Sequence, residues 1–305
     1  MIAPDWLWIP VTLGAAIAQT LRNAAQRHLT PVLGTLGATL VRFLYGLPFA
    51  ALWFLVVRVA GDDDMPAANG LFLAWIVMAS LAQIAATALL LRVMAERNFA
   101  LGVAYAKSEV LQIAVFGLLF LGDPLTAVAL FAVVLGTLGV LMLSPPDRER
   151  PLGTLVSGWT TRPALLGMAS GAGFAVAAVG YRGAALALEG TPFLMAAAYT
   201  LVAAQALQTV LLGGWLLARN AGVVVRVLRE WRRSVFAGSM GAVASACWFT
   251  AFVLQPAAHV RTLGLVEIFF SYAVSRHFFR EAITRVEVIG MALLAAAVAL
   301  ISFAR

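Results

Sequence analysis

Long apolar stretches separated by short polar ones dominate this chain. Five of them carry no charged residue, and each approaches or exceeds the roughly 20 residues that a helix needs to cross a bilayer. These stretches are Leu71–Leu91, Ala127–Ser144, Pro163–Tyr181, Thr191–Ala218 and Ser234–Ala258. A soluble domain would need a charged exterior that such segments cannot supply. The pattern therefore predicts an all-α polytopic membrane protein.

Five further apolar stretches are interrupted by a few polar or charged positions. They are Trp6–Leu21 continuing toward His28, Thr35–Val57 with Arg42, Phe99–Leu121 with Lys107 and Glu109, His259–Ser275 with Glu267, and Val288–Phe303. With these, we expect ten transmembrane helices. No basic stretch precedes the first of them, so we expect it to be retained and not cleaved as a signal peptide.

Composition agrees with this class, because 62% of the residues are hydrophobic, 11% are charged and the mean hydropathy is +0.94. The net charge of +7 comes mostly from arginines between the apolar stretches. In a membrane protein such arginines set the orientation of the spans, so we expect no nucleic-acid partner. About fifteen arginines fall in odd-numbered loops and about four elsewhere. The positive-inside rule therefore predicts that the odd-numbered loops are cytoplasmic and that both termini lie outside. The basic residues are almost all arginine, and alanine is abundant. This composition is typical of a bacterium with a GC-rich genome, so we expect the protein in the bacterial inner membrane.

Landmarks recur in the two halves of the chain. The pairs are Thr30-Pro31 with Thr191-Pro192, Arg22 with Arg182, Glu109 with Glu267, and Asp123-Pro-Leu-Thr126 with Glu281-Ala-Ile-Thr284. The last two pairs are both separated by 158 residues. We therefore divide the chain into a first five-helix repeat (1–148), a linker (149–162) and a second five-helix repeat (163–305). An odd number of helices per repeat implies repeats of inverted orientation, an arrangement that suits alternating access.

Short motifs in both repeats resemble the drug/metabolite transporter superfamily of the EamA type. In the first repeat they are Ser108-Glu109-Val110 and the segment from Leu118 to Thr126; in the second they are Val266-Glu267-Ile268 and the segment from Phe278 to Thr284, followed by Gly290. Arg280 replaces the glycine of the second motif, and the proline that often follows the glutamate is absent from both repeats. The resemblance implies a ten-helix carrier of small metabolites without a prosthetic group. It also implies termini in the cytoplasm, against the arginine count.

Polar side chains within the apolar stretches are the candidates for a substrate site. A carboxylate at mid-bilayer costs about 2.5–3.5 kcal/mol, so Glu109 and Glu267 are expected to have a function, although protonated glutamates that only donate hydrogen bonds remain an alternative. Helical spacing places other polar and aromatic residues in stripes beside them. The candidates for substrate binding are Glu109, Glu267, Tyr105, Gln112, Arg42, Lys107, Gln19, Asn23, Gln83, Trp248, Phe252 and Ser271. Interhelical hydrogen bonding remains the alternative for the uncharged stripes.

Two basic candidates carry specific expectations. Lys107 lies about 200° around a helix from Glu109, so the two should not pair within that helix. Arg42 is expected either to be a counter-ion of one glutamate or to touch the substrate. Few other basic residues are expected to face the cavity.

These observations predict a secondary transporter and no enzyme. The sequence contains no Walker-type loop, no metal-binding cluster and no nucleophile elbow, so we expect no cofactor and no metal. Charges of both signs beside aromatic rings favour export of amino acids, including large hydrophobic or aromatic ones. We expect the protein to be able to work as a monomer. The alternatives are a carrier of anionic metabolites such as nucleotide sugars, which needs several basic residues in the cavity, and a receptor or assembly component without transport.

Overall fold

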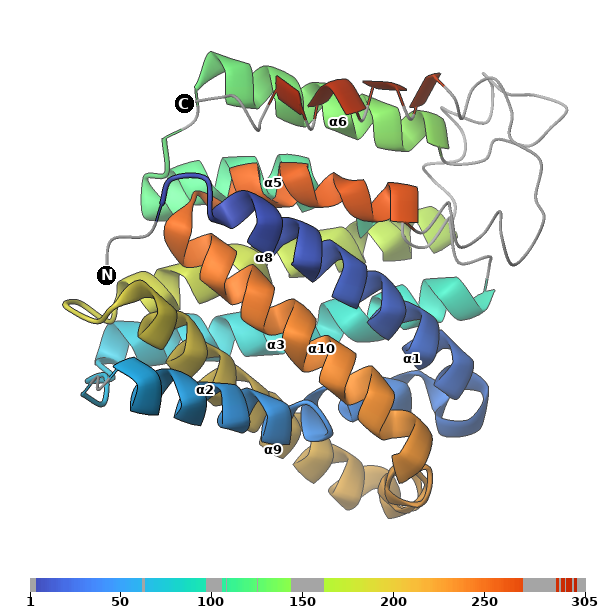
Figure 1. The fold of residues 1–305 in the computed structure, drawn as a ribbon. Helices are drawn as coiled ribbons and strands as arrows, with labels where there is room; N and C mark the ends of the chain where they lie inside the picture. The colour runs from blue at the N-terminus through green and yellow to red at the C-terminus, as the bar shows by residue number, and fades with distance from the viewer. Residues whose placement is uncertain are drawn as a thin grey trace, which may run out of the picture.

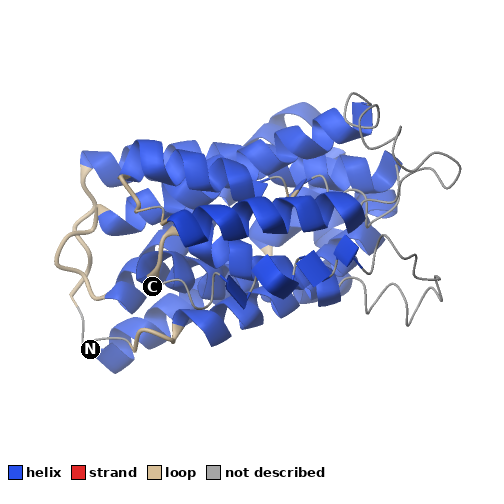
Figure 2. Cartoon of the chain, turned by 90° about the horizontal axis from the view of Figure 1, so that it is seen from above, coloured by secondary structure: helices blue, strands red, loops and turns tan. Residues whose placement is uncertain are grey.

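The computed structural model describes residues 4–61, 64–96, 106–107, 109–124, 126–143 and 162–270, and short helical pieces between 289 and 300. Throughout these residues the regular structure is helical, so the predicted all-α class is confirmed for the described part. The helices lie side by side in one bundle, with α6 at one edge and α9 at the opposite edge (Figures 1 and 2).

The first part of the chain forms α1 to α6. Its elements are α1 (Trp8–Leu44), α2 (Leu47–Gly61), α3 (Gly70–Glu96), α5 (Glu109–Phe116), the π-helical turn η1 (Gly117–Leu121) and α6 (Ala127–Leu143). The second part forms the remaining helices. These are α8 (Arg162–Leu186), α9 (Phe193–Arg229), α10 (Trp231–Leu254), α11 (Ala257–Leu263) and the 3₁₀ turn η3 (Gly264–Val266), after which residues 267–270 are again helical.

Gly34 divides α1 into two helical segments. Its φ of 71° and ψ of 169° interrupt the helix, and a positive φ is a conformation that glycine adopts without steric cost. Gln26, before the break, donates a hydrogen bond from Nε2 to the carbonyl oxygen of Ala38 beyond it, at 2.8 Å. Because of this break, the helical segments before and after Gly34 lie side by side. It separates the predicted first and second transmembrane helices, and the second is interrupted again between α1 and α2.

Four helical stretches within the described residues are long and apolar enough to cross a membrane. They are Trp8–Gly61, Gly70–Glu96, Phe193–Arg229 and Trp231–Leu254, and the described chain also has shorter apolar helices at Gln112–Leu121 and Ala127–Gly139. Many large hydrophobic side chains are exposed on these helices, among them Leu52, Val59 and Val210. Such an apolar surface is compatible with contact to lipid. The structure is therefore compatible with a membrane-embedded protein, and the count of ten spans stays a prediction.

Two pairs of helices form the most extensive contacts of the bundle: α1 with α10, and α3 with α8. The core between them contains many alanines, such as Ala79, Ala175, Ala178 and Ala244, each fully buried or nearly so. Small side chains let helix backbones approach closely, which is how helices associate where lipid provides no hydrophobic driving force. This close packing encloses a cluster of polar side chains.

Candidate functional site

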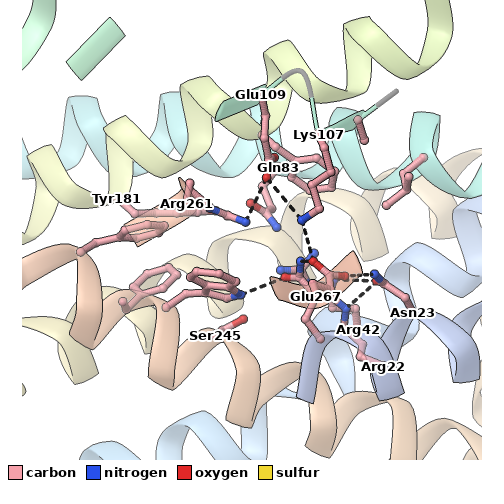
Figure 3. Close-up of a pocket in the computed structure, with 17 residues that line it drawn as sticks. Arg22, Asn23, Arg42, Gln83, Lys107, Glu109, Tyr181, Ser245, Arg261 and Glu267 are labelled. Carbon is pink, nitrogen blue, oxygen red and sulfur yellow. Dashed lines mark hydrogen bonds and ion pairs between the residues drawn. The ribbon is translucent and has the colours of Figure 1, made fainter. Parts of the chain in front are cut away.

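A polar pocket lies at the centre of the bundle, between α1, α3, α8, α10 and the region from α11 to Glu267 (Figure 3). Six acidic or basic side chains line it: Arg22, Arg42, Lys107, Glu109, Arg261 and Glu267. Each has at most 8% of its surface exposed. The pocket has a free volume of about 40 Å³. Since one water needs about 10–15 Å³ by this measure, the space corresponds to roughly three waters.

Glu267 accepts three hydrogen bonds in the pocket. Its Oε2 accepts hydrogen bonds from Gln19 Nε2 at 2.7 Å and from Lys107 Nζ at 2.6 Å, and its Oε1 accepts from Asn23 Nδ2 at 3.1 Å. The donors come from α1 and from Lys107, two residues before the start of α5, so this one carboxylate ties three segments of the bundle together.

Lys107 and Arg261 both contact the second carboxylate. Lys107 Nζ lies 3.9 Å from Glu109 Oε1, and Arg261 Nη1 lies 3.3 Å from the same oxygen. The expectation that Lys107 and Glu109 should not pair is therefore wrong. It assumed one continuous helix, whereas α5 begins at Glu109 and Lys107 occupies a turn before it. Lys107 thus contacts both glutamates.

Arg22 and Arg42 have neutral partners within the described residues. Arg22 donates from Nε and Nη2 to Asn23 Oδ1 at 3.2 and 2.7 Å, and its Nη1 is buried without a partner there. Arg42 donates from Nη1 to Thr87 Oγ1 at 3.2 Å, and the Gln83 oxygen, in the amide orientation that faces it, accepts from Nη2 at 2.6 Å. Arg42 forms no ion pair with either glutamate, so the counter-ion expectation is not met.

Aromatic rings from α8 and α10 form the opposite wall of the pocket. Trp248 donates from Nε1 to Gln19 Oε1 at 2.9 Å, and its ring stacks on Phe252 with centroids 6.0 Å apart. The Arg261 guanidinium lies 4.3 Å from the Trp248 ring centroid, a cation–π distance. Tyr181 packs on Phe249 with centroids 4.5 Å apart. The site therefore offers both charged groups and a broad apolar face.

One end of the bundle beside the pocket is closed by an arginine–aspartate pair. Arg182 of α8 contacts both carboxylate oxygens of Asp123, with Nη2 2.9 Å from Oδ1 and Nε 3.0 Å from Oδ2. Arg182 Nη1 also donates to the backbone carbonyl oxygens of Phe252 and Gln255 at the end of α10. These bonds join α8, the turn after η1 and α10, next to the aromatic wall.

Most of the predicted site residues meet in this pocket. Those that line it are Gln19, Asn23, Arg42, Gln83, Lys107, Glu109, Trp248, Phe252 and Glu267. Gln112 is described but lies outside the pocket lining. Tyr105 and Ser271 lie outside the described residues, as do most of the linker and the second-repeat motif from Phe278 to Thr284.

Two of the four basic residues of the pocket, Arg22 and Arg261, were not predicted as site residues. Arg22 was expected in a loop between apolar stretches, yet it is only 2% exposed. The missed signal is its spacing of three residues from Gln19 and four from Gln26. Arg261 lies six residues before Glu267, which on an α-helix is about 240° around the axis. The 3₁₀ turn η3, with about three residues per turn, rotates the two onto a common side.

The expectation of few basic residues in the cavity is also wrong. Four cationic and two anionic side chains line the pocket among the described residues. With every group in its ordinary charge state, these six carry a net charge of about +2. The condition that the sequence analysis set for an anionic solute, several basic residues in the cavity, is therefore met.

A solved structure resembles this chain over nearly its whole length. A crystal structure of a protein 15% identical in sequence matches it with a TM-score of 0.64, covering 96% of this chain and 94% of that chain. At this level of identity the likeness shows the fold alone. No protein-family model matches the chain, and a search of curated proteins gives no match.

Proposed function

We propose that the protein is a secondary transporter that binds a small charged metabolite in the central pocket and releases it on the other side of the membrane. The observation that carries this proposal is the cluster of six buried acidic or basic side chains within an apolar bundle. Burying charges in such a place is costly, and apolar residues of similar volume often stabilise a protein as well or better. A cluster of this kind is best explained by a solute that uses it.

Alternating access is the mechanism that fits the predicted repeats. If the two halves correspond as proposed, the first predicted span is equivalent to the sixth and the third to the eighth. In the structure these spans are the first segment of α1, α8, α3 and α10. The two most extensive contacts, α1 with α10 and α3 with α8, are then equivalent to each other. Two equivalent interfaces of opposite orientation support exchange between an inward-open and an outward-open state. The small volume of the pocket and the Arg182–Asp123 pair at one end favour a closed state between them.

The family resemblance extends the proposal. Under it, the protein is a ten-helix transporter of the EamA type in a bacterial inner membrane, and Glu109 and Glu267 are equivalent residues of its two repeats. Both glutamates line the same pocket, and Lys107 contacts both. This meeting of two residues 158 positions apart supports the correspondence between the repeats.

The charge of the pocket favours an anionic solute. Both glutamates already contact cations of the protein, while Arg22 and Arg42 have no carboxylate partner among the described residues. A small organic anion with an apolar portion would neutralise the excess positive charge and contact the aromatic wall. Amino acids are the second candidate class, because the glutamates can bind an ammonium group and the stacked Trp248 and Phe252 suit a large apolar side chain.

Counterflow in liposomes that contain the purified protein tests the proposal. The labelled solutes are succinate, glucose 6-phosphate, phenylalanine and leucine, each compared between wild type and Glu267→Gln. We expect flux of at least one solute, reduced at least tenfold by the substitution. Glu230→Gln is the control, because Glu230 forms only an exposed pair with Arg233. If wild-type protein moves none of these solutes, the transport proposal is wrong, and a receptor or assembly role becomes the better explanation.

A further inference from the structure

Two arginines line the pocket without a carboxylate at ion-pair distance among the described residues, although Asn23 links Arg22 to Glu267 by hydrogen bonds. Arg22 comes from the first segment of α1 and Arg42 from the second, and Figure 3 shows them beside each other on the same side of Glu267. Their aliphatic stems meet over Gly241 of α10. A β-carbon built at Gly241 would lie 3.3 Å from Arg22 Cδ and 3.5 Å from Arg42 Cγ. The two guanidinium groups are thus brought together by close packing of both stems against one glycine.

The hydrogen bonds of these arginines leave capacity for another acceptor. Arg22 uses Nε and Nη2 for a single oxygen of Asn23, while Nη1 has no partner among the described residues, although Arg22 is 98% buried. Within the described residues, Arg42 donates hydrogen bonds only to the neutral acceptors Thr87 and Gln83. A guanidinium stays protonated in proteins, so these groups cannot relieve their repulsion by losing a proton.

The glutamates of the pocket, both within the described part of the chain, balance the charge of Arg22 only from a distance and form no ion pair with Arg22 or Arg42. Both oxygens of Glu267 are taken by Gln19, Asn23 and Lys107, and Glu109 contacts Lys107 and Arg261. A buried cation without a counter-ion is strongly destabilising. The strongest partner for two adjacent guanidinium groups is an oxyanion that accepts paired hydrogen bonds from their planar forks.

We propose that Arg22 and Arg42 form an oxyanion subsite that binds a carboxylate or phosphate group. The ligand is the transported solute, an identification that rests on the function proposed above. Its remaining atoms extend toward the aromatic wall, which lines the same pocket. The 40 Å³ of free volume is too small for such a ligand, so binding requires the pocket to widen.

Thermal unfolding of the purified full-length protein in detergent, followed by tryptophan fluorescence, tests the subsite. The probes are succinate and inorganic phosphate, titrated against sodium chloride at equal ionic strength. We expect at least one probe to raise the Tm of wild type in a saturable way, because a ligand that binds the folded state stabilises it. The probe that acts identifies the group: succinate indicates a carboxylate and phosphate a phosphoryl group.

Substitutions then locate the effect. Arg22→Gln and Arg42→Gln should each weaken the binding of the active probe at least tenfold. Arg162→Gln should leave it unchanged, because the Arg162 side chain is 68% exposed, lies outside the pocket lining and forms a 3.8 Å pair with Glu96. Gly241→Ala keeps every charge and places a β-carbon 3.3 Å from Arg22 Cδ, so the Arg22 stem must shift by a few tenths of an ångström and binding should weaken as well. This variant keeps the test decisive if an arginine substitution prevents folding.

Each outcome separates the subsite from the transport proposal. No stabilisation of wild type by either probe overturns the subsite, as does equal weakening by Arg162→Gln or full binding by Gly241→Ala and Arg42→Gln. If the protein moves phenylalanine in liposomes while neither anion binds, transport stands and the subsite falls. If an anion binds through Arg22 and Arg42 but no solute is moved, the subsite stands and transport falls.

Discussion

The ion pair between Lys107 and Glu267 should be strongly coupled to the stability of the bundle. Lys107→Met removes the cation and leaves Glu267 with the neutral donors Gln19 and Asn23. Glu267→Gln removes the anion and leaves Lys107 with Glu109 at 3.9 Å. Either change breaks a 2.6 Å contact between groups that are 95% and 99% buried.

The expected cost follows from this burial. Breaking a buried pair by removing one partner typically costs about 3–5 kcal/mol, because the other charge is left uncompensated. In a Lys107→Met/Glu267→Gln double variant no such charge remains at the pair. We therefore expect the double variant to lose about as much stability as one single variant, which gives a coupling energy of roughly 3 kcal/mol. If 1 kcal/mol corresponds to ~2–4 °C, each single variant should lower Tm by roughly 6–20 °C.

Thermal unfolding of the four proteins in detergent measures the cycle. A second cycle on Arg233→Met and Glu230→Gln is the control, since that pair is 3.4 Å apart but its side chains are 63% and 30% exposed. Its coupling should be at most about 1 kcal/mol. Additive losses in the Lys107 and Glu267 cycle would refute the reasoning, because they would mean that the two charges do not stabilise each other.

Two further substitutions probe the packing around the pocket. Trp248→Phe keeps a ring beside Arg261 but removes the 2.9 Å bond to Gln19, so it should lower stability by about 0.5–1.5 kcal/mol and weaken solute binding; unchanged binding in a titration would exclude the ring nitrogen from the site. Gly238→Ala would place a β-carbon 2.5 Å from backbone and Cβ atoms of Tyr45, so α1 and α10 must separate at a cost of about 1–3 kcal/mol or more, and an unchanged Tm would contradict this contact.

The apolar pattern was sufficient to predict the helical class and most of the described helices. Uncharged runs such as Leu71–Leu91 and Ser234–Ala258 have one stable form in lipid, a helix, because every backbone polar group must be bonded within the segment. The break at Gly34 lies between the predicted first and second spans, and Asn220 follows the predicted end of the span Thr191–Ala218. The interruption between Leu44 and Leu47, inside the predicted run Thr35–Val57, was not predicted, because hydropathy gives no signal for a local backbone rotation.

Prediction of the site worked where a residue stood on a regular helix. Gln19 and Asn23 share a face at a spacing of four, and both contact Glu267. It failed beside irregular backbone, where rotation of 100° per residue does not hold. Lys107 precedes the start of α5, and Arg261 is separated from Glu267 by the 3₁₀ turn η3. The partners of these residues lie more than 150 positions away in the chain, a relation that local periodicity does not contain.

The long sequence separation of the pocket's ion pairs affects how the protein is made. Lys107 and Glu267 are 160 residues apart, and Glu109 and Arg261 are 152 apart. At a synthesis rate of about 5–20 residues per second, Lys107 leaves the ribosome roughly 8–30 s before its partner exists. During that interval Glu109, 3.9 Å away in the finished protein, is the pocket carboxylate available to Lys107. The 2.6 Å pair with Glu267 and the Arg261 pair of Glu109 form only after the rest of the chain is made, so completion of the pocket is a late event in biogenesis.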